Sequence, residues 1–280
     1  MKLSLSCRIA ESSSRKDAAA LPIEKLAPLA ATAGFSGLSM RASAISIDTL
    51  PDRVSEIRQL LDTNGLAASM VMGNVALAAN NTEAPDCLRN ITPHLNLAEC
   101  LGANLVRVMI QHEDDIPHAQ RSADEAKERG ISLSQQTHWG TLAETVDGTL
   151  ELVDRMARSN FGITFEPANL LACGDNFGPD VVRRLAPHLV NFYFQNVRLD
   201  PAGAHTFKTR AVGPVSLSYV ALDDPGGIEI APLIATLKDC NYDGWTSTNP
   251  YGKASPSPMP STRPRASSVP SSPSPPSTSV

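Results

Sequence analysis

Short apolar runs alternate regularly with helix-like stretches along the chain. Six of the runs begin at a glycine or asparagine, a seventh begins at His188, an eighth opens the sequence, and most finish on polar or charged residues. Eight strands separated by helices over about 250 residues predict a (β/α)8 barrel. The expected strands lie within Lys2–Ser6, Gly34–Met40, Gly65–Asn74, Gly102–His112, Gly130–His138, Asn160–Asn169, His188–Arg198 and Asn241–Asn249.

The stretches between the runs carry apolar residues every three or four positions, which is typical of helices that bury one face. Asp48 or Thr49 is expected to cap the first clear example, and Thr145 a second. These helices are expected over Pro51–Asp62, Thr145–Ser159 and Ile228–Cys240. The strands between them are expected to be apolar on both faces, because helices cover a parallel sheet.

One internal segment does not follow this alternation of apolar runs and helix-like stretches. Leu199–Gly227 is long and loop-rich and contains His205, Lys208 and Arg210. Loops of this length in a compact domain are often lids or binding loops, so a lid over the barrel mouth is expected here.

The C-terminal segment departs in composition. Residues 253–280 are dominated by serine and proline, which predicts a disordered tail after a barrel domain of residues 1–252. This tail stands where the eighth covering helix belongs, so the barrel is expected to lack a proper eighth helix. A truncation, a partner that covers the gap, or an altered reading frame near Lys253 are the open explanations.

Composition narrows the class of protein. A chain of 280 residues with 42% hydrophobic content can bury one large core, and a net charge of −5 argues against nucleic-acid binding. The N-terminus has no long apolar segment, so a cytoplasmic protein without a membrane span is expected. Five scattered cysteines without a CxxC pair predict reduced thiols. Neither a phosphate-binding GxxxxGK loop nor a GxSxG elbow occurs, which argues against nucleotide hydrolysis and serine esterase chemistry.

Four sequence blocks point to a family. The blocks GISLSQQTHWG at 130–140, FGITFEPAN at 161–169, LVNFYFQNVR at 189–198 and NYDGW at 241–245 stand in this order. Together they resemble the sugar phosphate isomerase/epimerase family of xylose isomerase-like TIM barrels. The likeness covers roughly Met1–Tyr251 and implies the same barrel fold.

The resemblance also implies a metal site, from which this chain departs. In that family the ends of the fifth to eighth strands usually supply Glu, Asp, His and Glu to one divalent cation. The matching residues here are Gln136, Glu166, Tyr193 and Asn249. An Mn or Mg ion held by Glu166, Gln136 and Asn249 would bind weakly, because amides add no charge, unless His138 or His112 joined the ligands.

Two residues are the candidates for proton transfer. Glu166 ends an apolar run, and a buried site at the barrel mouth would raise its pKa toward that of a general base. The alternative is a carboxylate that only holds an arginine in place. His138 lies on the same strand face as Gln136 and could shuttle a proton, or could simply orient the next loop.

Other polar residues are candidates for substrate binding because they lie at strand ends or in the expected lid. Arg107 stands inside an apolar strand, where it needs a carboxylate partner such as Glu166 or a substrate oxyanion. The full predicted set is Gln136, Arg107, Asn169, Gln195, Asn196, Arg198 and His205. Solvated loop residues are the alternative for several of them.

The resemblance therefore implies an isomerase or epimerase that moves a proton next to the carbonyl of a small sugar or sugar acid. The sugar-like substrate is the expected partner, and a homo-oligomer is possible. Two alternatives remain open. One is a catalytically silent barrel that binds a sugar-like ligand or a protein, and the other is a lyase or dehydratase on the same scaffold.

Overall fold

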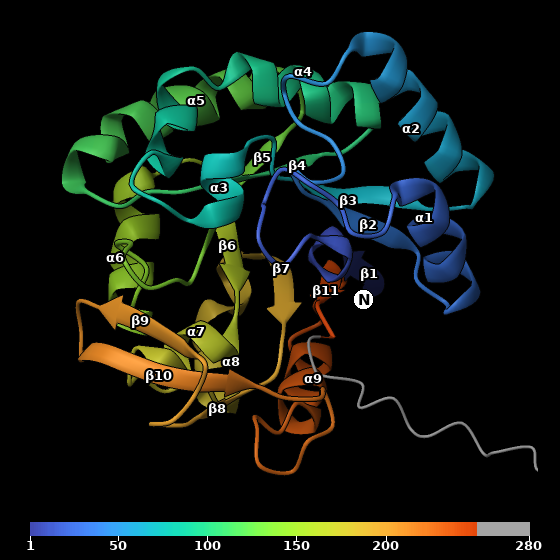
Figure 1. The fold of residues 1–280 in the computed structure, drawn as a ribbon. Helices are drawn as coiled ribbons and strands as arrows, with labels where there is room; N and C mark the ends of the chain where they lie inside the picture. Colours follow the sequence, from blue (N-terminus) through green and yellow to red (C-terminus); the bar gives the residue numbers. More distant parts are fainter. Residues whose placement is uncertain (251–280) are drawn as a thin grey trace, which may run out of the picture.

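The computed structural model describes residues 1–250, and eight parallel strands of this part of the chain close into a barrel (Figure 1). Their order around the barrel is β1-β11-β7-β6-β5-β4-β3-β2. All eight predicted strands are confirmed. They are β1 (Lys2–Ser6), β2 (Gly37–Met40), β3 (Ala67–Val71), β4 (Leu105–Val108), β5 (Ser132–Gln136), β6 (Phe161–Phe165), β7 (Leu189–Phe194) and β11 (Trp245–Thr248).

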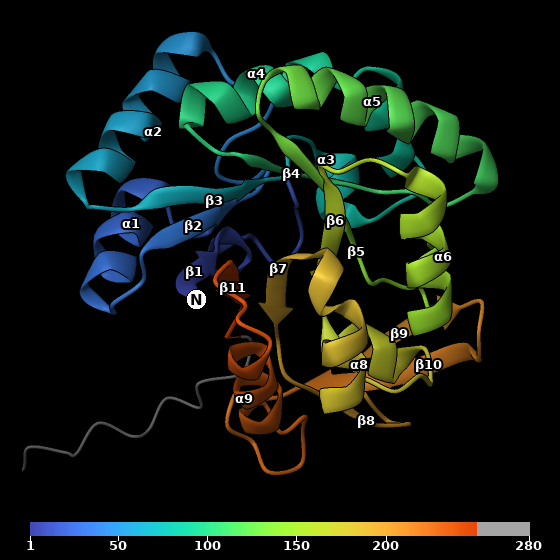
Figure 2. The same ribbon diagram turned by 180° about the vertical axis from the view of Figure 1, so that it is seen from behind.

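Helices surround the barrel on its outside, as Figures 1 and 2 show from opposite sides. Within residues 1–250 they are α1 (Ile23–Thr32), α2 (Pro51–Thr63), α3 (Val75–Ala79), α4 (Thr92–Leu101), α5 (Ile116–Glu128), α6 (Val146–Met156), α7 (Pro167–Ala172), α8 (Pro179–Leu185) and α9 (Ala231–Asp239). Short 3-10 turns follow β1 (η1, Cys7–Ala10), precede α4 (η2, Ala84–Arg89), precede α5 (η3, Glu113–Asp115) and precede β7 (η4, Ala186–His188). The predicted tail and the place of an eighth helix lie outside the described residues.

The predicted helix starts are confirmed in one case and wrong in another. Thr145 caps α6, because its Oγ1 accepts a hydrogen bond from the Gly148 amide at 3.1 Å. No side chain caps α2, whose first residue is Pro51. Thr49 instead accepts a hydrogen bond from the Ser46 amide at 2.9 Å. Proline at the first helical position has no amide hydrogen to satisfy, which reduces the need for a cap.

The expected loop between β7 and α9 is largely a three-stranded antiparallel sheet, which corrects the sequence-based interpretation. Its strands are β8 (Val197–Leu199), β9 (His205–Thr209) and β10 (Gly213–Tyr219), in the order β8-β10-β9. The β9–β10 hairpin lies beside α6 and α7 in both views (Figures 1 and 2). Only one side of this hairpin packs on the barrel, so its sequence is mixed in polarity and gives a weak strand pattern.

The inner faces of the barrel strands are polar rather than apolar. Ser4 and Ser69 hydrogen-bond across the interior at 2.5 Å, as do Ser134 and Thr164. The large apolar side chains, such as Ile163 on the same strand as Thr164, belong to the core clusters that pack strands and helices together. The expectation of strands apolar on both faces is therefore wrong for the inner face, where several small hydroxyls hydrogen-bond to one another.

Candidate functional site

A cavity of about 320 Å³ opens at the C-terminal ends of the barrel strands. This is the end of a (β/α)8 barrel at which side chains from different strands converge. Six strands contribute a polar or charged side chain at or near their ends to its lining. These are Arg8 (β1), Arg41 (β2), Arg107 (β4), Gln136 (β5), Glu166 (β6) and Gln195 (β7). The strand-end prediction thus leads to a common cavity for Gln136, Glu166 and Gln195.

Glu166 is the acidic side chain of the cavity lining. It directly follows β6 and precedes Pro167, the first residue of α7, and only 2% of it is exposed. Its backbone is held by Thr137 on the neighbouring segment, since the Glu166 amide donates to Thr137 Oγ1 at 2.9 Å. The Thr137 hydroxyl donates to the Glu166 carbonyl at 3.2 Å. These contacts fix the direction in which the carboxyl group leaves the strand.

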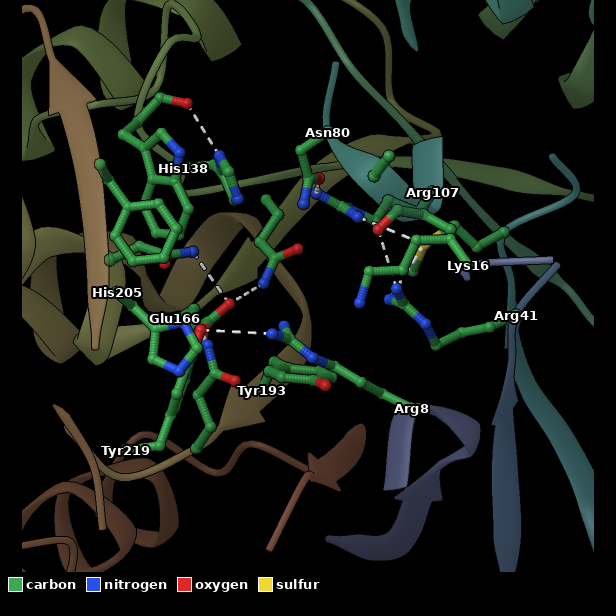
Figure 3. A pocket seen from close by; sticks show the side chains of 18 of the residues that line it. Arg8, Lys16, Arg41, Asn80, Arg107, His138, Glu166, Tyr193, His205 and Tyr219 are labelled. Carbon is green, nitrogen blue, oxygen red and sulfur yellow. Dashed lines mark hydrogen bonds between the residues drawn. The ribbon is translucent and has the colours of Figure 1, made fainter. Parts of the chain in front are cut away.

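Three side-chain amides surround the Glu166 carboxyl group. Gln136 and Asn169 donate to Oε2, the latter at 2.9 Å, and Gln195 donates to Oε1. Dashed lines at Glu166 in Figure 3 mark these bonds. A carboxylate offers about four acceptor positions. Since Oε1 receives a single amide hydrogen bond, it keeps a lone pair that can accept a proton from a ligand.

The orientation of Asn169 is fixed by a neighbour that allows one arrangement, and that of Gln195 agrees with its contact to Asn249. The Nδ2 group of Asn169 also donates to the Thr137 carbonyl oxygen at 2.8 Å, and a carbonyl can only accept. Gln195 Oε1 accepts from Nδ2 of Asn249 at 3.4 Å, so its amide nitrogen faces Glu166. The sequence-predicted Asn249 therefore acts behind Gln195 and is not part of the cavity lining.

Burial dominates the electrostatics of Glu166. Loss of water raises the pKa of this carboxyl group from 4.5 to about 7, against the opposing effects of Arg8, Arg107 and the amide donors. A carboxyl group with a pKa close to neutrality can both take up and release a proton at physiological pH.

His138 lines the same cavity and is held in one tautomer. Its Nδ1 lies 2.8 Å from the Trp139 carbonyl oxygen, so Nδ1 carries the proton and Nε2 the lone pair (Figure 3). Burial, with Arg107 and Arg8 as further causes, lowers the pKa of His138 to about 3. At neutral pH the imidazole is therefore uncharged and accepts a hydrogen bond through Nε2.

Arg107 reaches into the cavity from β4, but its hydrogen bonds go to neutral groups. Its guanidinium donates to Asn80 Oδ1 at 2.5 Å and to the Leu77 carbonyl oxygen at 3.3 Å, with Met72 Sδ also at 3.3 Å. The expected carboxylate contact to Glu166 is not formed. Burial lowers the pKa of Arg107 to about 10, so the side chain stays charged at neutral pH.

The β9–β10 hairpin covers one side of the cavity with aromatic rings. Trp139 packs against Phe207 with ring centroids 4.1 Å apart, and His205 contacts the edge of Tyr219 at 4.8 Å. All four of these residues line the cavity. The predicted lid is therefore present as an ordered hairpin, and His205 lies on its cavity side.

A buried carboxylate fastens the turn of this hairpin to the barrel. The Glu144 side chain accepts hydrogen bonds from the backbone amides of Arg210 at 2.9 Å and Ala211 at 3.0 Å. It also accepts one from the Gly140 amide at 2.6 Å. Charge-assisted bonds of this kind are stronger than neutral ones, so Glu144 stabilises the lid in its closed position.

Two predicted binding residues lie away from the cavity. Asn196 is fully buried and serves the backbone, donating to the Ala221 carbonyl at 3.0 Å and accepting from the Ile228 amide at 2.7 Å. Arg198, on β8, lines a separate surface groove beside α9. Strand β7 ends at Phe194, so the chain has already left the barrel at these two positions.

Sequence reasoning missed three basic side chains of the cavity, Arg8, Arg41 and Lys16. Arg8 and Arg41 come shortly after the ends of β1 and β2, and Lys16 lies in the segment after η1. The strand-end rule reaches Arg8 and Arg41 if it is extended by one or two residues past each apolar run. No pattern near Lys16 or Tyr219 signals that either residue reaches the cavity.

The donors around Glu166 do not fit an Mg or Mn ion. Such ions need several oxygen ligands and a compensating negative charge, whereas Gln136, Asn169 and Gln195 present amide hydrogens to one carboxylate. Within residues 1–250, no three His, Cys, Asp or Glu side chains group together as metal ligands. The positive charges of Arg8 and Arg107, which act on Glu166, oppose a cation further.

A cavity at the strand ends of a closed parallel barrel, with a buried acid at its wall, defines the class of (β/α)8 barrels with a ligand-binding mouth. The profile of the family described as xylose isomerase-like TIM barrel matches residues 27–264. The chain therefore belongs to this family. No curated protein matches the chain in sequence.

Solved structures share the fold at low identity. The probable 3-DHS dehydratase AsbF from Bacillus anthracis has a TM-score of 0.70 at 17% identity, over 91% of this chain and 94% of that one. A xylose isomerase-like TIM barrel protein from Mycobacterium smegmatis in complex with magnesium has a TM-score of 0.67 at 17% identity, over 90% of this chain and 91% of that one. The D-allulose 3-epimerase from Methylomonas sp. in complex with D-allulose has a TM-score of 0.61 at 16% identity, over 90% of this chain and 85% of that one.

The described residues include no helix that is both long and apolar enough to cross a membrane.

Proposed function

We propose that the protein is an isomerase or epimerase that moves a proton next to the carbonyl of a small sugar or sugar acid. The observation that carries the proposal is Glu166, a buried carboxyl group in the cavity wall with a pKa of about 7 and a lone pair left on Oε1. Proton removal beside a carbonyl needs a base of this strength, positioned before the substrate arrives.

In this proposal the ionised Glu166 accepts the proton on Oε1. The amides of Gln136, Asn169 and Gln195 hold the carboxylate in place, and they favour its ionised form. As the carbonyl oxygen gains negative charge, the Arg8 guanidinium in the cavity lining stabilises it. The uncharged His138 accepts a hydrogen bond from a substrate hydroxyl through Nε2.

The proton is returned either by Glu166 itself or by a second group. Return by Glu166 to the carbon of the former carbonyl, while the proton of the adjacent hydroxyl passes to the former carbonyl oxygen, gives an isomerase. Return from the other face of the substrate gives an epimerase, and His205, the other imidazole of the cavity lining, is our candidate for this step. His138 does not carry this step, because its Nδ1 proton is bound to the Trp139 carbonyl and its Nε2 has no proton at neutral pH.

The test measures the exchange of the substrate proton with solvent and not the formation of a product. D-Fructose, D-allulose and D-galacturonate are incubated with the protein in D2O, and the proton next to the carbonyl is followed by NMR. The wild-type protein is expected to replace this proton by deuterium, with a rate that rises as Glu166 ionises through a pH of about 7.

The Glu166→Gln variant is expected to lower the exchange rate by at least about a hundredfold, the usual contribution of a general base. Glu151→Gln is the matched control, because Glu151 lies exposed on α6. Exchange that survives Glu166→Gln contradicts the proposal. Ligand binding without any exchange identifies a silent barrel instead, and exchange coupled to loss of a hydroxyl identifies a dehydratase.

A further inference from the structure

The cavity has walls of opposite chemical character. Glu166 and His138 lie on one side, and the basic side chains Arg41, Arg107 and Lys16 lie on the other, with Arg8 between them (Figure 3). The acidic wall comes from β5 to β7, whereas the basic wall comes from β1, β2 and β4. A small ligand that fills the cavity touches both.

The positive charges of Arg41 and Lys16 in the basic wall are balanced by a carboxylate of the protein itself. Glu11, itself buried, accepts hydrogen bonds from Arg41 Nε and from Lys16 Nζ, the latter at 3.2 Å. Arg41 also donates to the Ala78 carbonyl oxygen at 2.9 Å. These bonds hold Arg41 in a fixed geometry. Its side chain therefore shapes the cavity wall, and its positive charge is balanced by Glu11.

Arg107 is not neutralised in this way. It is 2% exposed, it forms no ion pair with any carboxylate of residues 1–250, and its hydrogen bonds go to neutral groups. Its Nε–H, which is buried, has no hydrogen-bond partner in the same part of the chain. A buried cation in this state is costly unless an anion approaches it.

The charge balance defines that anion. Three guanidinium groups, of Arg8, Arg41 and Arg107, share the cavity region with two carboxylates, of Glu11 and Glu166. One buried positive charge is left over, and Lys16 is partly exposed and screened by solvent. A single negative charge on the ligand completes the balance, which fits a carboxylate better than a phosphate dianion.

We infer that the substrate carries a carboxylate group, bound at Arg107, at the end opposite the carbon that loses its proton to Glu166. The carboxylate bound at Arg107 is independent of the proposed function, whereas its position opposite the reacting carbon rests on that proposed function. It narrows the substrate class to small acids such as sugar acids, and it makes Arg107 the residue that distinguishes them from neutral sugars. An arginine suits this task because its planar group binds a carboxylate through two parallel hydrogen bonds.

The experiment compares three probes that differ only at carbon 6. D-Galacturonate carries a carboxylate there, D-galactose a hydroxymethyl group and D-galactose 6-phosphate a phosphate. Binding is measured by calorimetry on the wild-type protein, because the Glu166 carboxylate is part of the charge balance that the probes test. We expect the acid to bind at least about tenfold tighter than the neutral sugar, as for one charge-assisted contact, and tighter than the phosphate.

Variants then locate the carboxylate. Arg107→Met is expected to remove the preference for the acid, and Arg107→Lys to restore part of it, whereas Arg183→Met, on the outside in α8, leaves it unchanged. If Arg107→Met does not fold, Arg107→Gln, which keeps hydrogen-bond donors but removes the charge, tests the same contact. It is expected to weaken binding of the acid more than that of the neutral sugar.

Three outcomes overturn the inference: equal affinity for acid and neutral sugar, tighter binding of the phosphate, or no binding of the acid at its solubility limit. None of these touches the proposed proton transfer, which is judged by exchange on the wild-type protein. Conversely, a silent barrel that prefers the acid would refute the reaction and leave the carboxylate site standing.

Discussion

Asn169 stands three residues after Glu166, and its Nδ2 donates to the Glu166 carboxyl oxygen Oε2 at 2.9 Å. The same nitrogen donates to the Thr137 carbonyl oxygen at 2.8 Å. One amide therefore ties the acid at the end of β6 to the segment that follows β5. Because both acceptors use the same NH2 group, this bridge orients the carboxyl group and also fixes which end of the amide faces it.

Removing this bridge should weaken both the fold and the base. Asn169→Leu leaves the Thr137 carbonyl oxygen without its donor, and we expect a loss of about 1–3 kcal/mol in the free energy of unfolding, measured by urea denaturation. The pKa of Glu166 should rise further, because one donor to its ionised form is lost, so the midpoint of the pH–rate profile should move to higher pH. Asn96→Leu, at an exposed position on α4, is the control. An unchanged midpoint would show that Asn169 does not act on Glu166.

The raised pKa of Glu166 should appear in the pH dependence of stability. Between pH 4.5 and about 7 the folded protein keeps the Glu166 proton that the unfolded chain releases. The wild-type protein should therefore lose stability relative to Glu166→Gln as the pH rises through this window, by on the order of 3 kcal/mol. Below and above the window the difference should be constant.

Only the difference between the two proteins is informative here. The depressed pKa of His138 gives an opposite slope, since that group gains stability as the pH rises from about 3 toward its unfolded value of 6.5. This contribution is common to the wild-type protein and to Glu166→Gln, so it cancels in the comparison. Denaturation curves collected in steps from pH 4 to 8 are the measurement, and a difference that stays flat throughout would refute the raised pKa.

Divalent cations should not stabilise the wild-type protein through Glu166. We expect Mg²⁺ or Mn²⁺ to shift the melting temperature of wild type and of Glu166→Gln to the same extent. Gln136→Glu, which places a second carboxylate beside the first, should create a larger shift in the presence of the ion, since two carboxylates attract a hard cation. A cation-dependent shift in the wild type that disappears in Glu166→Gln would mean that the amides permit a metal after all.

The lid should depend on Glu144. Glu144→Gln removes the charge from a side chain that holds the amides of Arg210 and Ala211, so the β9–β10 turn should open more often. We expect faster hydrogen exchange in residues 205–213 and weaker substrate binding, with little change at the barrel strands. Glu151→Gln is again the neutral comparison. Unchanged exchange in the hairpin would assign the closure to the aromatic contacts of Phe207 alone.

The sequence by itself determined the barrel and the position of its acid. Each strand is a local apolar run, most of them with a glycine or asparagine in front, and such runs need no knowledge of distant contacts. Because parallel strands all end at the same edge, the polar residues at the run ends, Gln136 and Glu166 among them, could be assigned to one cavity in advance.

Only the tertiary structure decided what this cavity can do. Two of the three donors that surround Glu166 come from positions 29 and 30 residues away, and the cations come from the first half of the chain, so no local pattern reveals their meeting. The pKa of Glu166 and the unbalanced charge of Arg107 depend on how much water these neighbours exclude. Burial and long-range electrostatics are properties of the folded arrangement, which is why residue types at strand ends predicted the cavity but not its charge or its tautomers.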